Sequence, residues 1–381
     1  MNRRRKLLMM MSGVKFDPSS LFANGEEGVW YEPKPEYLFQ DSAGTTPVTA
    51  DGQPVGLMLD RSKGLDTGTR IESNGEFNNG TTGWLVNGGV TSSVENGVMT
   101  VSDIGTTGGK FQDISSTEEY LKVKVRIRRV LGASTQLWIT NIGTFDTPRR
   151  IISIENSDFE EYELIHLNAS GEGIRVYLRC NSDSTLQVSD VSVQEIPGNH
   201  ATQDTTASKP LYRTDGTLHW LEFDGVDDFM FSLNNVQMNS DAFLCCGSEG
   251  LGDGTETIFW QGSSNANRFQ LFQSVSGVPA LRSAGANIDH TVTSLAKYVF
   301  RMEAGKSPDY LRGWVNRGDF VESNASQIEW VDTGITLGAT HIGAQNGNIK
   351  LYGVVFCTNP VSEKDGLESE AYFAKLAGVE L

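Results

Sequence analysis

Hydrophobic and polar residues alternate over many short stretches of the chain. In LKVKVRIRRV (121–130), the hydrophobic residues Leu121, Val123, Val125 and Ile127 occupy every second position, and lysines and arginines stand between them. Successive side chains of a strand point to opposite faces, so this pattern predicts a strand with one buried and one solvated side. The basic side predicts either a solvated strand face or a surface for an anionic glycan or phosphate.

Similar short runs recur between clusters of Gly, Asn, Asp and Ser. They include QLWIT, GIRVYLRC, LHWLEF, ETIFWQG, RFQLFQS, KYVFRM, LRGWVN and IKLYGVVF. Short strands separated by turn residues are typical of antiparallel sandwiches. A longer run with helical spacing, EKDGLESEAYFAKLAGVEL, stands at the end of the chain. We therefore predict an all-β protein of two antiparallel β-sandwiches with a short C-terminal helix.

Composition and charge narrow the class of protein. The chain has 381 residues, which predicts two domains at about 100–200 residues per domain. Its 41 glycines and 38% hydrophobic residues are typical of a turn-rich globular protein. The net charge of −17 disfavours a nucleic-acid-binding face. No segment reaches the roughly 18–20 apolar residues that a bilayer span requires, so we expect a soluble chain without membrane insertion.

The cysteines predict no cross-links. Cys180, Cys245, Cys246 and Cys357 are few for this length and show no CxxC spacing. This pattern indicates neither a disulfide framework nor a zinc site. We expect buried, reduced thiols and synthesis in a cytosol.

The first residues, MNRRRKLLMMMSG, combine basic and hydrophobic side chains. The run LLMMM is shorter than the hydrophobic region of about 7–15 residues in a secretory signal. We interpret residues 1–19 as a docking arm, because Arg pairs with carboxylates and Met adapts to irregular grooves. The alternative is a disordered start. The expected contact residues are Arg3, Arg4, Arg5, Leu7 and Leu8.

The sequence indicates an internal domain boundary. The strand-like run GLMLD (56–60) passes into SKGLDTG, after which we expect a new domain to start with IESNGEFNNGTTGW (71–84). A second strand-like run, TLQVSDVSVQEI (185–196), stands directly before a Pro-Gly pair. The ends of a compact domain often lie close together, which makes insertion into a surface loop feasible. We therefore predict an inserted domain at 71–196 within a discontinuous domain formed by 20–70 and 197–381.

The outer segments resemble a family of phage virion proteins with a concanavalin A-like (laminin G-like) sandwich. The resemblance lies in FANGEEGVWYEPKPEYLFQDSAGTTPVTADGQPVGLMLDRS, GNHATQDTTASKPLYRTDGTLHWLEFDGVDDFM and GATHIGAQNGNIKLYGVVF. In that family LMLD-x-S and GNHA are near neighbours, whereas about 135 residues separate them here. The insert, with NGEF, Trp84 and SDVSV, is similar to carbohydrate-binding modules of the galactose-binding-like jelly-roll type.

The resemblance implies a structural protein of the phage virion, in the tail fibre or baseplate region, that contributes to attachment to host-surface glycan. It would be made in the cytoplasm of the host bacterium and be present in many copies per particle. Its partners would be other virion proteins, docked through the arm and through Trp30 and Tyr31, and host surface polysaccharide. The alternatives are a purely architectural protein of capsid decoration or tail assembly, and a polysaccharide depolymerase.

Two tryptophans of the insert, Trp84 and Trp138, are the candidate glycan-binding residues. Flat aromatic rings stack on sugar rings while polar neighbours bind the hydroxyls. Both positions also fit a hydrophobic core, and the sequence leaves the two interpretations open.

Three carboxylates, Asp224, Asp227 and Asp228, stand together in EFDGVDDFM. Such a group requires compensation by hydrogen bonds or by a hard cation such as Ca²⁺. Asp-Gly is also ordinary hairpin-turn chemistry, so either a turn or a metal site is expected here.

The resemblance of the insert implies a second candidate, a structural calcium held by Glu76 and Asp190 between its first and last strands. The chain departs from the family pattern at Ser189, where a second acidic residue is common. Structural calcium is thus the one cofactor that we consider.

Catalytic patterns are weak. Ser264 lies in GSSNA, which imitates a nucleophile elbow but stands between two predicted strands, without the following helix. The histidines show no partner spacing. Glu155, Asp158 and Glu160 form a loop-like acidic cluster and no clear glycosidase pair. We predict no catalytic residues and no enzymatic activity.

Overall fold

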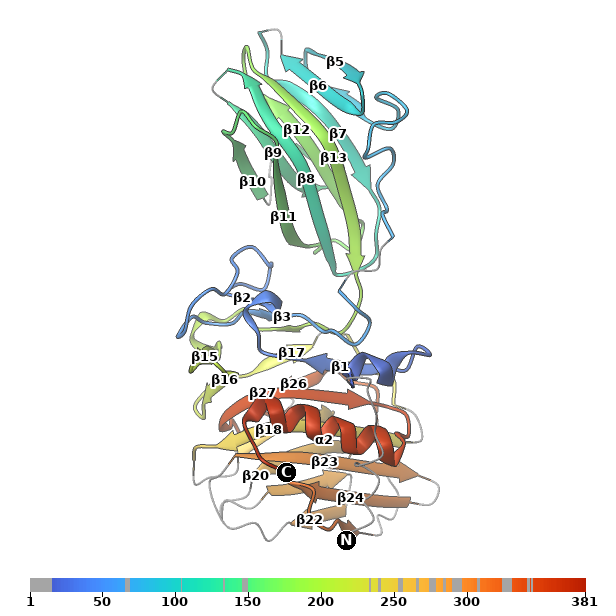
Figure 1. Cartoon of the computed structure of the whole chain (residues 1–381), viewed down its shortest axis with the longest axis vertical. Coiled ribbons are helices and arrows are strands. Elements are labelled where there is room, and N and C mark those ends of the chain that lie inside the picture. Colours follow the sequence, from blue (N-terminus) through green and yellow to red (C-terminus); the bar gives the residue numbers. More distant parts are fainter. Residues whose placement is uncertain are drawn as a thin grey trace. The chain divides into compact units, whose positions relative to one another are not determined.

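The computed structural model describes residues 16–381, except 66–68, 104, 133, 146–149, 233, 239–240, 253–255, 265–266, 274–278, 284–285, 290–296, 307–308, 324–330, 341–342 and 344. The predicted arm contacts Arg3, Arg4, Arg5, Leu7 and Leu8 lie outside the described residues. Contacts between Cα atoms divide the chain into two compact units (Figure 1). The outer unit contains the residues up to Ser42, then Thr46–Leu65 and Gly198–Leu381, and the inserted unit contains Ala43–Thr45 and Asp66–Pro197.

The outer unit is built from two antiparallel sheets. The eight-stranded sheet has the order β15 (Leu211–Thr214), β16 (His219–Asp224), β27 (Asn348–Cys357), β18 (Asp241–Gly250), β23 (Lys297–Lys306), β24 (Asp309–Val315), β25 (Val321–Ser323), and β1 (Gly28–Tyr31) also pairs with β27. The nine-stranded sheet has the order β2 (Leu38–Phe39), β3 (Leu57–Met58), β14 (Ala201–Thr202), β17 (Met230–Ser232), β26 (Ile335–Leu337), β19 (Glu256–Gly262), β20 (Arg268–Gln273), β21 (Pro279–Ser283), β22 (Ala286–Asp289).

Side chains from both sheets form the main core of the outer unit. Phe356 of the eight-stranded sheet contacts Phe259 and Phe269 of the nine-stranded sheet, with ring centroids 5.1 and 5.4 Å apart. Three short 3₁₀ helices, η1 (Pro18–Phe22), η2 (Pro35–Tyr37) and η3 (Thr206–Ser208), lie in the connections. All four cysteines of the chain are buried and free.

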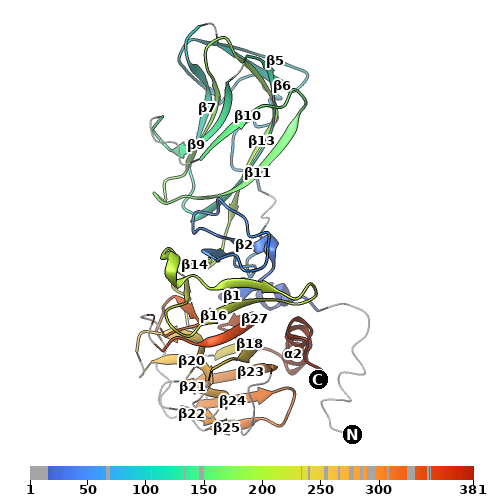
Figure 2. The ribbon, with the colours of Figure 1, turned by 90° about the vertical axis from the view of Figure 1, so that its left-hand side faces the viewer.

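The helix α2 (Glu363–Ala377) covers the eight-stranded sheet at β18, β23 and β27 (Figure 2). Ser362 caps its start by accepting a hydrogen bond from the Asp365 amide, and Gly378 ends it in the left-handed conformation. Phe373 and Ala374 pack into a second hydrophobic cluster beneath the helix. Among the described residues, no helix has the length and hydropathy needed to cross a membrane.

The inserted unit is a sandwich of two five-stranded antiparallel sheets. One sheet has the order β10 (Arg150–Ile154), β9 (Thr135–Asn141), β12 (Ile174–Cys180), β7 (Gly108–Ile114), β4 (Leu85–Asn87). The other has the order β11 (Glu160–Leu167), β8 (Tyr120–Leu131), β13 (Thr185–Ile196), β6 (Val98–Asp103), β5 (Val90–Glu95). The prediction of an all-β chain with antiparallel sandwiches and a C-terminal helix is confirmed.

Strand β8 shows why the alternating pattern was informative. Its hydrophobic residues Leu121, Val123, Val125 and Ile127 are fully buried in the core of the inserted unit. On the opposite side, Lys122 and Lys124 lie 3.3 and 2.6 Å from the carboxylate of Glu163 on β11. The part of the basic strand face that Lys122 and Lys124 form is therefore solvated, and its positive charge is paired with a carboxylate.

A buried carboxylate joins the two chain segments that flank the insertion. Asp60 is fully buried and accepts hydrogen bonds from the backbone amides of Trp30, Ser62 and Asn199 at 2.8–2.9 Å. Its own amide donates to Nδ1 of His200 at 2.9 Å. The strands on either side pair directly, because Met58 of β3 lies opposite Ala201 of β14. The outer unit thus closes across the insertion.

Gly198 makes this close approach feasible. Its φ of +134° is disfavoured for other residues, and a Cβ there would lie 2.8 Å from Oδ2 of Asp60. LMLD-x-S and GNHA are therefore neighbours in space, although 135 residues separate them in sequence.

We expect Asp60→Asn to destabilise the outer unit. The amide group places a donor where the carboxylate accepts, so at least one buried backbone amide loses its partner, at a cost of about 2 kcal/mol or more. Chemical unfolding followed by tryptophan fluorescence measures this loss. Asp319→Asn, at an exposed aspartate of the same unit, is the matched control, and equal stability of the two variants would contradict the role of Asp60.

Candidate functional site

The outer face of the sheet β10-β9-β12-β7-β4 carries a row of hydrophobic side chains. Directly opposed residues of antiparallel strands share a face. The register aligns one residue from each strand, in the order Ile151, Trp138, Tyr177, Phe111 and Leu85. Their chain neighbours on β9 and β12 point into the core, so this row points away from it.

The next row across the same sheet is polar. It consists of Ser153, Gln136, Arg179, Gly109 and Asn87. Oε1 of Gln136 accepts hydrogen bonds from Arg179 Nη1 at 2.7 Å and from Trp138 Nε1 at 3.0 Å. The guanidinium carbon of Arg179 lies 4.4 Å from the centroid of the Trp138 ring. Gln136 therefore orients the indole and the guanidinium against each other.

The middle of the hydrophobic row is covered by a further aromatic residue, and Phe111 and Tyr177 there are only 8% and 2% exposed. Phe145 packs edge-on against Phe111 and Tyr177, with centroids 5.0 and 5.1 Å apart. Arg175 lies against the rings of Phe111 and Phe145 and binds Asp113 through two hydrogen bonds of 2.6 and 2.8 Å. Arg175 is thus a structural residue whose charge is already paired.

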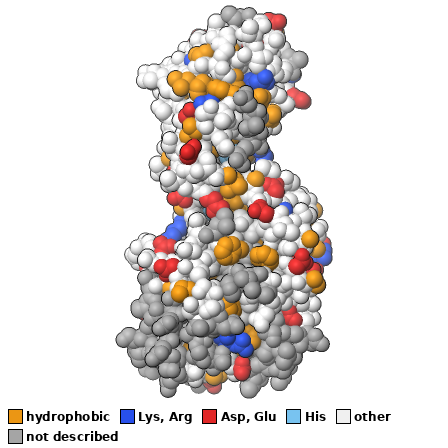
Figure 3. Space-filling view, turned by 180° about the vertical axis from the view of Figure 1, so that it is seen from behind, with side chains coloured by type: hydrophobic (Ala, Val, Ile, Leu, Met, Phe, Trp, Pro, Cys, Tyr) orange, Lys and Arg blue, Asp and Glu red, His pale blue; other side chains and the backbone are white. Residues whose placement is uncertain are grey.

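The rest of the face is open to solvent. Leu85 and Ile151, at the two ends of the hydrophobic row, are 57% and 49% exposed, and Trp138 between them is partly exposed. Figure 3 shows a band of hydrophobic side chains, with Lys and Arg side chains beside it, across the unit drawn at the top. Within the described part of the chain, no carboxylate lies within ion-pair distance of Arg179. The face therefore offers apolar area, hydrogen-bonding groups and an uncompensated positive charge.

Sequence reasoning found Trp138 but missed Arg179 and Gln136. The position of Gln136 was readable from the alternation of partly exposed and buried residues in QLWIT, whereas in β12 every residue except Arg179 is buried and alternation gives no signal. The pairing of β9 with β12, which places Gln136 opposite Arg179, is a tertiary property without a local signal.

The structure corrects the assignment of Trp84 to glycan binding. Trp84 is 3% exposed and belongs to the hydrophobic core of the inserted unit. Its ring packs against Phe77 with centroids 5.7 Å apart, and its Nε1 donates to the backbone oxygen of Asn74. A ring buried in this way has no face available to a sugar.

Trp30 and Tyr31 are also not available for docking. They are 2% and 0% exposed, because β1 lies against β27. Trp30 packs against Tyr372 of α2, and the hydroxyl of Tyr31 donates to the backbone oxygen of Asn199. Both are core residues of the outer unit, which corrects the docking prediction for this segment.

The predicted calcium ligands Glu76 and Asp190 meet around an arginine. The guanidinium of Arg70 lies 3.2 Å from Glu76 and 2.7 Å from Asp190, and it also pairs with the buried carboxylate of Glu72 at 2.5 Å. Arg70 further donates to the backbone oxygen of Val191. A fixed positive charge therefore stands among the carboxylates for which a cation was expected.

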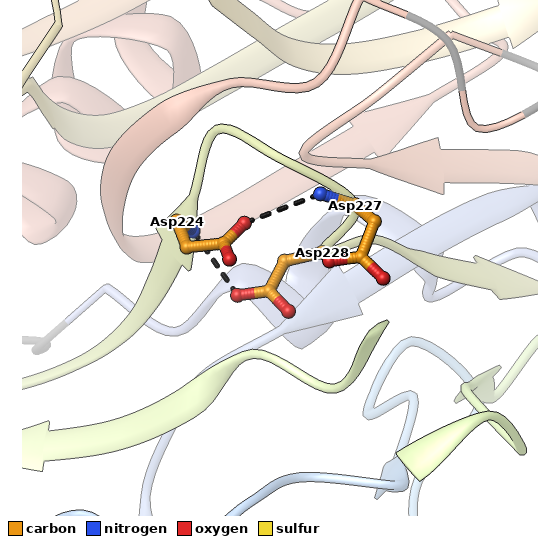
Figure 4. Close-up of side chains that lie close together, drawn as sticks. All are labelled: Asp224, Asp227 and Asp228. Carbon is orange, nitrogen blue, oxygen red and sulfur yellow. Dashed lines mark hydrogen bonds between the residues drawn. The ribbon is translucent and has the colours of Figure 1, made fainter. Parts of the chain in front are cut away.

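The carboxylates of Asp224, Asp227 and Asp228 lie within 4.8 Å of one another in the β16–β17 turn (Figure 4). Asp224 Oδ1 accepts from the amides of Val226 and Asp227, and Asp228 Oδ2 accepts from the amide of Asp224. Burial, with a smaller contribution from the neighbouring carboxylates, raises the pKa of Asp228 to about 6. These contacts are those of a hydrogen-bonded turn, and the spacing would also suit a cation.

No protein-family model and no curated protein sequence matches this chain. Among solved structures, the CBM40 of the Ruminococcus gnavus IT-sialidase matches with 10% identity and a TM-score of 0.30, over 34% of this chain and 83% of its own. The same module bound to alpha2,3 sialyllactose matches with 11% identity and a TM-score of 0.29, over 36% and 83%. Trypanosoma rangeli sialidase matches with 9% identity and a TM-score of 0.33, over 75% of this chain and 62% of its own. At such low identities and TM-scores, these likenesses carry no argument about function.

We expect Asp228→Asn to stabilise the outer unit at pH 7.5 but not at pH 4. Because the folded-state pKa is raised, the stability that the carboxyl contributes is full below about pH 4 and is lost as the pH rises through about 6. Above pH 6 the folded protein has to hold a charged carboxylate in a partly buried position, which costs on the order of 2 kcal/mol at pH 7.5. The amide of the variant does not ionise, so this cost is absent. Thermal unfolding at both pH values measures it. If millimolar calcium stabilised the wild type and not the variant, the cluster would instead be a cation site.

We expect Arg70→Ala to destabilise the inserted unit by about 3 kcal/mol, because the buried carboxylate of Glu72 loses its positively charged partner and keeps only the hydrogen bond from the Val193 amide. Chemical unfolding with and without millimolar calcium tests this. Calcium should stabilise the variant more than the wild type, since the guanidinium no longer opposes a cation. Arg126→Ala, at an exposed arginine of β8, is the control. A variant as stable as the wild type would contradict the role of Arg70.

Proposed function

We propose that the inserted unit binds glycan on the outer face of the sheet β10-β9-β12-β7-β4. The observation that supports this most directly is the pair formed by Trp138 and Arg179, which Gln136 holds in place. A hydrophobic row beside a polar row matches the two surfaces of a sugar ring, whose C–H groups pack on apolar side chains while its hydroxyls form hydrogen bonds.

Arg179 favours a sugar that carries a carboxylate. A guanidinium presents several N–H donors in one plane and binds carboxylates through paired hydrogen bonds. In a chain with a net charge of −17, general attraction for anions is weak, so a local cation is required for selectivity.

At the level of the whole chain, we propose a structural protein of the phage virion, in the tail fibre or baseplate region, that attaches the particle to host-surface polysaccharide. The support is the resemblance of residues 20–63 and 198–381 to that family of virion proteins. Weak single sites gain avidity when many copies act on one particle. The chain would carry out no catalytic step and would be made in the bacterial cytoplasm.

The first test measures binding of the labelled full-length protein to a panel of intact bacteria and to immobilised neutral and acidic glycans. We expect Trp138→Ala to weaken binding at least about tenfold, as truncation of a central aromatic contact residue commonly does. Arg179→Gln should weaken binding to acidic glycans and spare neutral ones.

Matched controls exist on the opposite sheet of the same unit, where Arg126 and Arg128 lie against the ring of Phe159. Phe159→Ala and Arg126→Gln should leave glycan binding unchanged. Binding that survives Trp138→Ala would remove this face from the attachment role. Absence of binding to every cell and glycan would favour an architectural virion protein, and release of reducing sugar in the same tubes would favour a depolymerase.

A further inference from the structure

A pocket lies in the outer unit, between the C-terminal end of helix α2 and the hairpin formed by β15 and β16. Its volume is about 510 Å³, and small-molecule sites typically have roughly 300–1,000 Å³. Its walls come from the residues after β1, the β15–β16 turn, β27 and the end of α2, all within the outer unit. The pocket is therefore formed by packing within one compact unit, and no residue of the insert contributes to it.

The walls of this pocket are largely apolar. Leu218 of the hairpin turn and Leu376 of the helix line it, together with the aromatic residues Tyr352 of β27 and Tyr372 of α2. The hydroxyl of Tyr352 donates to Oε2 of Glu249 at 2.9 Å, and this contact fixes its ring. Rings and leucine side chains held by the fold provide preformed surface for the flat apolar part of a ligand.

The one carboxylate among the lining residues is already compensated. Glu32 is 0% exposed and forms ion pairs with the guanidinium of Arg61 and with the ammonium group of Lys34. It also accepts a hydrogen bond of 3.1 Å from the hydroxyl of Tyr372. Two cations thus meet one carboxylate, which leaves an excess of positive charge. The side chain of Lys34 is 33% exposed and lines the pocket, so solvent and ligands can reach this charge.

A second ammonium group comes from the last turn of the helix. Lys375 lines the pocket and is exposed, and within the described part of the chain no carboxylate lies at ion-pair distance from it. A lysine in this position also interacts favourably with the helix dipole, so Lys375 alone does not indicate a ligand. His219 lines the same pocket, with Nδ1 bonded to the hydroxyl of Tyr212 at 2.6 Å. The groups around the apolar walls are thus mainly cations and donors, which complement an anion.

We propose that this pocket binds a small organic anion, namely an aromatic carboxylate, with its ring against the tyrosine and leucine side chains and its carboxylate beside Lys375 and Lys34. An uncharged ring would leave the ammonium groups without a partner, and a small hydrophilic anion would leave the apolar walls in water. The net charge of −17 repels anions in general, so a local excess of positive charge is required for one to bind.

The test is a ligand-observed NMR titration of the full-length protein at pH 7.5 and constant ionic strength. The probes are phenylacetate, its uncharged analogue phenylacetamide, and acetate. We expect phenylacetate to bind in a saturable way and each of the other two to bind at least about tenfold more weakly, because phenylacetamide lacks the charge and acetate lacks the ring.

Variants locate the binding site. We expect Lys375→Glu to weaken phenylacetate binding at least about tenfold, because repulsion replaces attraction, and to leave the weak binding of phenylacetamide unchanged. Lys364→Glu makes the same change of charge on the same helix, at an exposed lysine outside the lining of the pocket, and should bind like the wild type. Arg179→Gln should also keep full binding, since its guanidinium belongs to the face of the insert.

Three results would overturn the proposal. The first is a wild type that shows no saturable binding of phenylacetate, and the second is a Lys375→Glu variant that binds it undiminished. The third is loss of binding in Arg179→Gln, which would place the ligand on the insert. If Lys375→Glu failed to fold, Lys375→Gln would decide, since glutamine is compatible with the helix but carries no charge: undiminished binding in that variant would equally count against the pocket. None of these results bears on whether the insert binds glycan.

Discussion

The burial of the Asp60 carboxylate is the constraint on which the outer unit depends. A carboxylate loses a large hydration energy when it is buried, and it remains folded only where several donors replace water. The amides of Trp30, Ser62 and Asn199 do so here. These donors come from β1 and from both sides of the insertion, so one buried charge holds together three segments of the chain.

This arrangement explains how a domain tolerates an insertion of this length. The entropy cost of closing a loop grows only slowly with its length. Among the described residues, the pairing of β3 with β14 and the hydrogen bonds of Asp60 involve no residue of the inserted unit. Within the inserted unit, Ile71 donates to the backbone oxygen of Val193, so the first and last segments of that unit also lie together.

The described arginines of both units have two kinds of surroundings. Arg70, Arg175 and Arg301 are paired with carboxylates and hold strands or the helix in place. Arg179 and Arg282 lie on aromatic rings, on sheet faces that point away from a core, without a carboxylate at ion-pair distance among the described residues. In a strongly acidic chain, a guanidinium without a carboxylate partner is the less expected of the two, and Arg179 is such a group on the face proposed to bind glycan.

The sequence by itself determined the fold class, because alternation of period two specifies a strand and which of its sides is buried, as β8 shows. It also determined the C-terminal helix, through the helical spacing of its hydrophobic residues, and the structure places Ser362 and Gly378 as the caps at its two ends. Only the tertiary structure decided which tryptophan lies at a surface. The sequence leaves both Trp84 and Trp138 open to a core or a surface interpretation, but Trp84 packs against Phe77 inside the sandwich, whereas the pairing of β9 with β12 places Trp138 beside Arg179. Likewise, no local pattern showed that Arg70 would stand between Glu76 and Asp190. Strand register and the pairing of distant segments are set by the packing of the whole core, and a local sequence pattern does not contain that information.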